Sequence, residues 1–201
     1  MTAKQTTPAN RPAKRPARAA LLEAASRRFY ADGLTGTGID TITAEAGVAK
    51  KSLYNNFSSK ADLVTAYLYA RHEEWLGLYR TRLEGAATAG ERVLAVFDAY
   101  ADHADLAYEH GFRGCGLLNA AAELPAGDPG REVVRQHKEK VEALLAKHLT
   151  ELLPPSAGQV APLARHLAFL LEGSMVRAGL EGDDHCIREA RRIAATLIGN
   201  L

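Results

Sequence analysis

The spacing of apolar side chains limits what this 201-residue chain can fold into. From Pro16 onward, apolar residues recur three and four positions apart, which is the spacing of one face of an α-helix. The first such face holds Leu21, Leu22, Ala25 and Phe29. A strand would need alternating apolar residues rich in β-branched side chains, and no run of that kind is long enough. We therefore predict an all-α fold.

Helix-breaking and helix-capping residues divide the chain into nine predicted helices. Gly33 is a stop signal for the first of them. Ser59 with Asp62 three positions later has the pattern of a capping box. Asp128 followed by Pro129 is an N-cap with proline at the first helical position. The predicted helices span about 16–32, 39–46, 50–57, 59–83, 91–109, 113–124, 129–152, 159–180 and 184–198.

Charge is distributed unevenly along the chain. The formal net charge is +1, but residues 1–60 hold ten Lys/Arg and four Asp/Glu, whereas residues 61–201 hold fifteen and twenty. A basic front and an acidic remainder favour a polyanion as partner of the front only. Chance variation in composition would give the same split, so the charge alone does not decide the point. Residues 1–15 are rich in Pro, Thr and basic residues and predict a disordered basic arm.

Composition also limits the cellular setting and the chemistry. No apolar run approaches the length of a membrane span, and the N-terminus lacks the apolar segment of a secretory signal. Two cysteines, Cys115 and Cys186, are too few for a disulfide framework and indicate a reducing, cytoplasmic location. We expect no catalytic site, cofactor or metal, because the sequence shows no Ser-His-Asp arrangement, nucleotide-binding glycine loop or metal-ligand spacing.

Residues 39–57 have the pattern of two short helices joined by a tight turn. The turn forms at Gly47, since glycine adopts a left-handed conformation without steric cost. The two-helix arrangement is that of a helix-turn-helix, in which the second helix reads DNA. The residues expected to form the turn and the inward face are Ile42, Gly47, Val48, Leu53 and Phe57.

The outward face of the second short helix carries groups suited to DNA. Lysines at its N-terminus and hydroxyl side chains can contact phosphates, and asparagine amides can pair with adenine in the major groove. A polar outer face is also the default for any surface helix, so the pattern is weak evidence by itself. The candidates from this face and the next helix start are Lys50, Lys51, Ser52, Tyr54, Asn55, Asn56 and Lys60.

The stretch "AGVAKKSLYNNFSSKADL", together with "ARAALLEAASRRFYADGLTGTGIDTI" before it, resembles the TetR-type family of transcriptional regulators over about residues 16–64. The resemblance implies a cytoplasmic homodimer with a nine-helix fold and a DNA-binding domain at residues 16–62. It also implies a ligand-binding and dimerisation domain at residues 63–201, and it adds Thr37 to the candidate DNA contacts. Two residues depart from the family pattern: Ala49 is a poor N-cap, and Gly38 lacks a hydroxyl.

The second half of the chain predicts a ligand pocket between helices. Cys115 and Asn119 share one helical face, and aromatic residues on other helices could complete a mostly apolar cavity. Plain core packing explains the same aromatics. Cys115 is either an inert buried thiol or a redox sensor, and for the latter Arg113 is the nearest cation in sequence. The candidate pocket residues are Trp75, Phe97, Tyr100, Cys115, Asn119, His137 and Phe169.

The last two predicted helices are apolar on more than one side, which favours a homodimer interface. Burial within a single chain is the alternative. Taken together, the sequence predicts a ligand-responsive repressor that binds a pseudo-palindromic operator as a dimer and is released by an unidentified small-molecule effector. The alternative is a helical small-molecule carrier or enzyme that retains the front only as a structural hairpin.

Overall fold

The computed structural model describes residues 17–106, 109–153 and 158–201, and within them it is all-helical. The predicted disordered arm at residues 1–15 lies outside the described residues. Nine α-helices and no strand occur in the described ranges, which confirms the predicted fold class. The helices are α1 (Ala17–Asp32), α2 (Ile39–Glu45), α3 (Lys50–Asn56), α4 (Lys60–Glu84), α5 (Ala89–Ala104), α6 (Gly116–Glu123), α7 (Pro129–Leu149), α8 (Val160–Glu181) and α9 (His185–Gly199).

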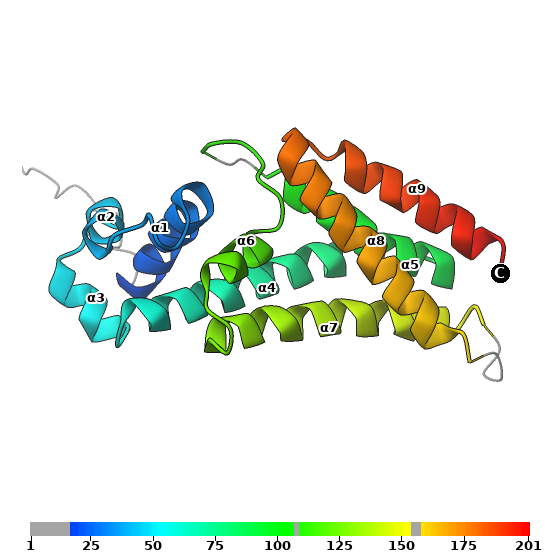
Figure 1. Ribbon diagram of the computed structural model, residues 1–201, viewed down its shortest axis with the longest axis horizontal. Helices are drawn as coiled ribbons and strands as arrows, with labels where there is room; N and C mark the ends of the chain where they lie inside the picture. The colour runs from blue at the N-terminus through cyan, green and yellow to red at the C-terminus, as the bar shows by residue number, and fades with distance from the viewer. Residues whose placement is uncertain (1–16, 107–108, 154–157) are drawn as a thin grey trace, which may run out of the picture.

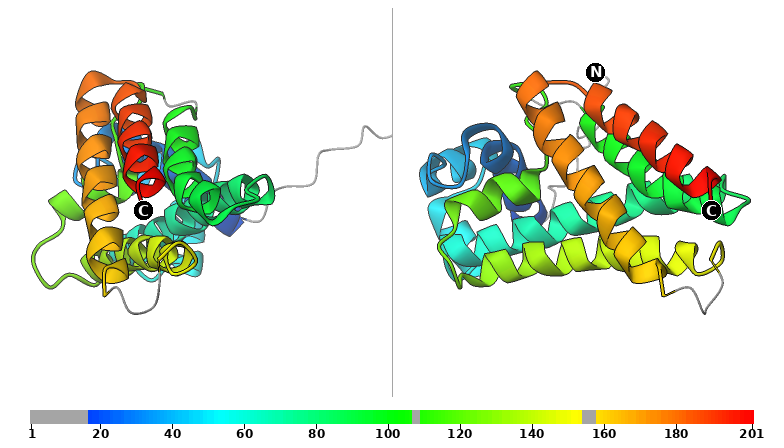
Figure 2. Two further views of the ribbon diagram at one scale, coloured as in Figure 1. Left: turned by 90° about the vertical axis from the view of Figure 1, so that its right-hand side faces the viewer. Right: turned by 45° about the vertical axis from the view of Figure 1, so that its right-hand side comes forward.

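The helices form two regions of unequal size. Helices α1–α3, which we call the head, gather at one end of the molecule, and α4 leads from the head into the larger body of α4–α9 (Figure 1). In the body, α7 runs beside α4, and α8 packs against both α7 and α9 (Figures 1 and 2). Among the described residues, no helix combines the length and the apolar content that crossing a membrane requires.

Local capping signals place several helix ends. The Ser59 hydroxyl accepts a hydrogen bond from Asp62 N at 3.1 Å, and the Asp128 carboxylate accepts one from Gly130 N at 2.7 Å, as the sequence predicts. Helix α5 begins two residues earlier than predicted because Thr88 and Glu91 form a reciprocal capping box.

Helix α6 begins three residues later than predicted. Gly114 adopts a left-handed conformation with φ +81°, which interrupts the helix, and Cys115 becomes the N-cap residue. A Cβ atom on Gly114 would lie 3.1 Å from Met175 O, so this connection passes very close to α8. The segment before α6 is therefore a tightly packed connection rather than part of the helix.

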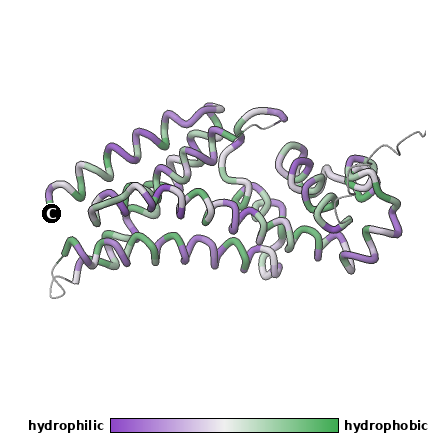
Figure 3. The backbone as a smooth tube through the Cα atoms, turned by 180° about the vertical axis from the view of Figure 1, so that it is seen from behind, coloured by the Kyte–Doolittle hydropathy of each residue, from purple (hydrophilic) through white to green (hydrophobic). Residues whose placement is uncertain are grey.

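The molecule has a continuous apolar core to which α4, α5, α7, α8 and α9 of the body contribute, and this core extends into the head through residues such as Phe29, Ile42 and Leu53. Tyr67, Phe97 and Tyr100 are among its largest fully buried side chains. Hydrophobic and hydrophilic positions alternate around α9 with helical periodicity (Figure 3). Its inner face packs on α5 and α8, and Arg191 is paired with Asp98 of α5 at 2.6 Å. The long body helices are thus packed together by this core and by the Arg191–Asp98 pair.

Candidate functional site

Helices α2 and α3 form the helix-turn-helix. Gly47 has φ +65°, the left-handed conformation that the sequence predicted for the turn. Ile42 and Leu53 are fully buried and Phe57 nearly so, which fixes the inner side of the motif. Val48 is half-buried rather than the fully enclosed plug that the sequence suggested, although it packs against the same core.

Ionic contacts attach the motif to α1. The Glu45 carboxylate at the end of α2 accepts hydrogen bonds from Arg27, at 2.6 Å, and from Arg28. Burial acts to raise the pKa of Glu45, but the two guanidinium groups outweigh burial and lower it. Arg18 of α1 lies 5.0 Å above the centre of the Phe57 ring at the end of α3. The two helices of the motif are therefore held to α1 at both of their outer ends.

The outward face of α3 is open to solvent. Lys51, Tyr54 and Asn55 are exposed there at helical spacing, and half of the Tyr54 surface is accessible. Lys50 is exposed as well, but its Nζ lies 2.8 Å from Asp40 Oδ1 at the start of α2. An ion pair between two exposed side chains is worth little, so a DNA phosphate can replace Asp40 as the partner of Lys50.

Three of the predicted DNA contacts have their side chains committed inside the protein. Thr37 is buried, and its hydroxyl donates to Gly33 O at 2.7 Å. The Asn56 amide nitrogen donates to Ser52 O at 2.7 Å, so it holds the end of α3 instead of projecting outward. Lys60 Nζ donates to a backbone carbonyl at 2.6 Å, that of Leu34 between α1 and α2. These three side chains therefore bond to backbone carbonyl oxygens of the head, and their contact with DNA stays a prediction.

A carboxylate from the body clamps the turn that follows α1. Glu123 at the end of α6 accepts hydrogen bonds from Leu34 N at 2.8 Å and from Thr35 N at 2.7 Å. Gly33 makes the approach possible, because it has φ +82° and a Cβ there would lie 2.7 Å from Glu123 Oε1. Burial acts to raise the pKa of Glu123, but the two backbone donors and Lys60 outweigh burial and lower it. The sequence did not reveal this contact.

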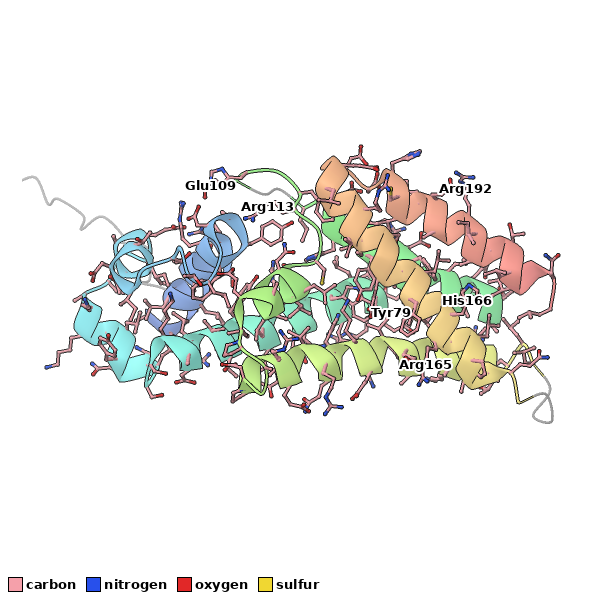
Figure 4. The ribbon with its side chains drawn as sticks, viewed as in Figure 1. Tyr79, Glu109, Arg113, Arg165, His166 and Arg192 are labelled. Atoms are coloured by element: carbon pink, nitrogen blue, oxygen red, sulfur yellow. The ribbon has the colours of Figure 1, made fainter. Side chains whose placement is uncertain are left out.

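A second link joins the C-terminal end of α1 to the connection before α6. The Tyr30 hydroxyl accepts a hydrogen bond from Arg113 N at 2.7 Å and donates one to Gly114 O at 3.1 Å. The Arg113 guanidinium donates to Tyr30 O at 3.0 Å and to Ala31 O, and Figure 4 shows Arg113 in this position between head and body. Arg113, the cation expected beside Cys115, therefore serves to hold α1.

The predicted pocket residues separate into two groups. Trp75, Tyr100 and His137 come together from three helices: the Trp75 ring centre lies 5.1 Å from that of Tyr100 and 5.3 Å from that of His137. Phe97 is fully buried in α5. Phe169 does not join them, because 65% of its surface is exposed on α8. The prediction that these aromatics line a single cavity is therefore wrong for Phe169.

Asn119 and Cys115 line a different space. Asn119 is exposed, and its amide nitrogen donates to Arg113 O at 2.9 Å. Together with Met175 and other residues of α8, the two border a surface hollow of about 300 Å³. Asn119 therefore does not reach the aromatic cluster, contrary to the prediction.

A buried histidine, His137, brings hydrogen-bonding groups into the aromatic cluster. His137 is hydrogen-bonded to the Tyr100 hydroxyl at 3.1 Å and to His72 at 2.9 Å. Burial, with the charge of Lys138 second, lowers the pKa of His137 to about 2, so this imidazole is neutral at physiological pH. Trp75 Nε1 has no hydrogen-bond partner within the described part of the chain. A guest with a hydrogen-bond acceptor would satisfy it.

The exposed face of α3, the left-handed turn at Gly47 and the basic front define a helix-turn-helix DNA-binding protein. Comparison with known proteins agrees: residues 21–67 match the family model described as bacterial regulatory proteins of the tetR family. The crystal structure of a TetR-family transcriptional regulator from Streptomyces coelicolor is 34% identical, with a TM-score of 0.78, and the match covers 91% of this chain and 94% of that one. This chain belongs to the TetR family of bacterial transcriptional regulators.

Two curated relatives match over shorter regions. The regulator TtgR of Pseudomonas putida is 43% identical over 56 residues, which are 28% of this chain and 27% of that protein. The transcriptional activator FasR of Mycolicibacterium smegmatis is 34% identical over 101 residues, which are 50% of this chain and 44% of that protein. The chain thus matches less than half the length of these relatives. All are regulators of transcription, so the family gives no support to an enzyme.

Proposed function

We propose that this protein is a dimeric, ligand-responsive transcriptional repressor that binds a pseudo-palindromic DNA operator. The observation that carries the proposal is the exposed face of α3, on which Lys51, Tyr54 and Asn55 project from a helix anchored by Leu53 and Phe57. In a helix-turn-helix, this face enters the major groove.

The side chains of α3 divide into two kinds of contact. Lys50 and Lys51 at the start of the helix, with Ser52 and Tyr54, contact phosphates and give affinity that depends on salt. Asn55 is the exposed amide and selects the base, while Asn56 supports the helix end. Thr37 and Lys60 act indirectly by holding the head in shape.

The dimer forms through α8 and α9. Large apolar side chains remain exposed on these two helices, and a second copy of the chain is the partner that the family suggests. Two α3 helices would then enter successive major grooves about 34 Å apart. The exposed apolar residues are Phe169, Val176, Leu180 and Ile193.

The effector acts on the body. A small molecule that occupies the region of Trp75, Tyr100 and His137 would favour body conformers in which the two heads are wrongly spaced for DNA. Such a molecule releases DNA only to the extent that it prefers those conformers. The contacts of Glu123 and Arg113 with the head, together with α4, carry the change.

Selection from a random-sequence DNA library, followed by salt titration of the selected fragment, tests the proposal. We expect sequence-selective binding that weakens steeply with salt. Tyr54→Ala should weaken it, whereas Tyr69→Ala, which removes an equally exposed tyrosine from the body helix α4, should not. The proposal fails if no fragment is selected, or if both variants bind like the wild type.

Activation of transcription is the alternative to repression in this proposal. The observation that favours it is the name of the relative FasR, which is a transcriptional activator. A reporter gene placed behind the selected fragment separates them: deletion of this protein raises expression if it represses and lowers expression if it activates.

A further inference from the structure

A hollow of about 480 Å³, which we call the junction hollow, lies where the head meets the body. Its walls come from the turn after α1, the first turns of α4, and the connection from α6 to α7. Its lining includes neither the aromatic cluster of Trp75, Tyr100 and His137 nor any residue of α8 or α9. The junction hollow is therefore separate from the region proposed for the effector and from the face proposed for the dimer.

The lining of the junction hollow is mostly apolar. Leu34 of the head and Val64 of α4 are buried at its base, and Leu124 and Pro129 border it from the body. A volume of a few hundred cubic ångströms with an apolar lining and a few polar groups is typical of a site for a small organic molecule.

Close packing holds the walls of the junction hollow in place. A Cβ on Gly130 at the start of α7 would lie 2.6 Å from Leu124 Cδ1 and 3.1 Å from Leu68 Cδ1 of α4, so α7 packs on α4 here without spare room. On the head side, the two hydrogen bonds of Glu123 hold the turn after α1. The junction hollow is therefore a preformed feature of this arrangement of head and body.

Acidic side chains outnumber basic ones around the junction hollow. Asp62, Asp128 and Glu123 line it together with the basic residue Lys60. Asp62 lies in the first turn of α4 and Asp128 caps α7, and each of these helix N-termini carries about half a positive charge. The Lys60 ammonium offsets one carboxylate, and the two helix ends together offset another. The junction hollow thus keeps an excess of about one negative charge.

The three carboxylates do not converge on one point. Within the ranges that the structure describes, no group of three or more His, Cys, Asp or Glu side chains is arranged to hold a metal ion. Asp62 already accepts a hydrogen bond from Ser58 N at 2.9 Å, and Asp128 accepts one from Gly130 N at 2.7 Å. A carboxylate can accept about four hydrogen bonds, so each has capacity for a further donor. The partner that fits is an extended organic cation.

We propose that the junction hollow is a second small-molecule site, which binds a monovalent organic cation with an apolar body, of the arylalkylamine class. The ammonium group donates hydrogen bonds to Asp62, Asp128 and Glu123. The apolar body of the molecule packs on Val64 and Leu124. Binding forms and breaks no covalent bond.

A guest in the junction hollow contacts the head and the body at the same time. It therefore binds best when the two walls are together, and it holds the turn after α1 against the body. A head that is already held in place loses less freedom when it binds DNA, so the cation should strengthen DNA binding. This consequence rests on the proposed function, whereas the binding of the cation can be measured without DNA.

Titration of the isotopically labelled full-length protein at pH 7 tests the site by nuclear magnetic resonance. The probes are 4-phenylbutylamine, 4-phenylbutanol and 4-phenylbutyrate, which share an apolar body and differ in charge. We expect the amine to bind about tenfold more tightly than the carboxylate and to shift the amide signals of Thr35, Ala61 and Glu123. Equal affinities, or shifts confined to the aromatic cluster, would overturn the proposal.

Variants that remove charge locate the ammonium group. Asp62→Asn and Asp128→Asn keep an oxygen acceptor for their backbone hydrogen bonds, so both should fold. Each should weaken binding of the amine about twofold to fivefold and leave binding of the alcohol unchanged. Glu84→Gln, which removes an exposed charge at the other end of α4, is the matched control. Equal affinity for the amine in all three variants would contradict the proposal.

A variant that fills the junction hollow tests its shape. Ala61 is exposed on α4 and lines the junction hollow, so Ala61→Trp should occupy the space without disturbing the core. We expect this variant to lose binding of both the amine and the alcohol. Binding of the amine as tight as in the wild type would place the molecule elsewhere and overturn the proposal.

The effect on DNA is measured separately with a selected fragment. The amine should raise the DNA affinity of the wild type about fivefold, but not that of Ala61→Trp. If the amine binds in the junction hollow and DNA affinity does not rise, the link to DNA is wrong while the site and the proposed function stand. If no fragment can be selected at all, the proposed function fails, and the titration still decides whether the site exists.

Discussion

The head and the body place their functional groups in opposite ways. In the head, the groups proposed to meet DNA stand on the outside of α3, and Leu53 and Phe57 on its other side provide the anchor. In the body, the groups of interest are inside, where Trp75 and His137 contact each other from different helices. A surface that reads a large rigid partner can be built on one short helix, whereas a site for a small molecule needs several helices at once.

The two regions are joined by polar contacts around the end of α1 and by shared apolar packing. Glu123 holds the backbone after α1, Tyr30 and Arg113 hold the end of α1, and Arg28 pairs with Glu109 at 3.0 Å, a residue labelled in Figure 4. Apolar contacts join the regions as well: the Phe29 ring of α1 meets the Tyr67 ring of α4 edge to face at 5.4 Å, within an apolar core that runs through both head and body. The head, which is the smaller region, is therefore attached to the body by both polar and apolar contacts.

The largest expected effect comes from the core of the head. Leu53→Ala should destabilise the head by about 2–5 kcal/mol, because the side chain is fully buried and the small head can relax little around the cavity. The body should lose less stability, since most residues of the shared core lie on its helices. Hydrogen exchange resolved along the chain measures both regions. Equal loss of protection in α1–α3 and α4–α9 would contradict the division into two regions.

Between pH 7.5 and pH 5.5, acid should act on the body and spare the head. The described head contains no histidine, whereas burial first, and nearby cations second, lower the pKa of His103 to about 4 and that of His137 to about 2. Because these pKa values lie below the unfolded value of 6.5, the unfolded chain binds more protons as the pH falls, and stability is lost below pH 6.5. The loss approaches about 1.4 kcal/mol per pH unit for each histidine.

Denaturant unfolding at pH 7.5 and pH 5.5 measures this loss. His137→Asn should reduce the pH dependence, and His166→Asn, which changes an exposed body histidine labelled in Figure 4, should not. A pH dependence that is the same in all three proteins would show that the buried imidazoles do not cause it.

The contact between the regions should have an intermediate effect. Glu123→Ala leaves Leu34 N and Thr35 N without their acceptor, at a cost of about 1–3 kcal/mol if neither amide finds water. We expect faster amide exchange at these two residues and weaker DNA binding, with the body unchanged. Glu132→Ala, which removes an exposed glutamate of α7, is the matched control. Unchanged exchange at both amides would mean that the clamp does not hold the head.

The smallest effects separate phosphate contact from base choice on α3. Lys51→Ala should weaken binding to all sequences by about 1 kcal/mol and reduce the salt slope by about one. Asn55→Ala should cost a similar amount on the selected site but relax the preference at one base pair. Matching losses in both variants, independent of sequence, would mean that this division of the helix face is wrong.

The local features of the head could be predicted from sequence. The turn at Gly47 and the inward pair Leu53 and Phe57 follow from conformational freedom and helical spacing alone. The hydrogen bonds of Asn56 and Lys60 within the head could not be predicted in this way, because their acceptors are backbone carbonyl oxygens. Such acceptors leave no mark in a side-chain pattern.

In the body, the sequence identified candidate residues but not their partners on other helices. The sequence identified Cys115 and Tyr100 as candidates but chose Arg113 as the neighbouring cation, since it is two residues away. The cation that reaches the thiol is Lys138, which is 23 residues away in α7. Glu123 was missed for the same reason, because it lies 89 residues from Leu34. Contacts between distant helices depend on packing angles that periodicity does not contain.

Hydrogen exchange of the full-length protein, with and without a selected DNA fragment, tests the central claim most directly. We expect DNA to slow amide exchange in α3, residues 50–56, and at the turn held by Glu123, while the aromatic cluster of Trp75, Tyr100 and His137 keeps its exchange rates. Slower exchange in the body, with none in α3, would contradict the assignment of DNA reading to the head.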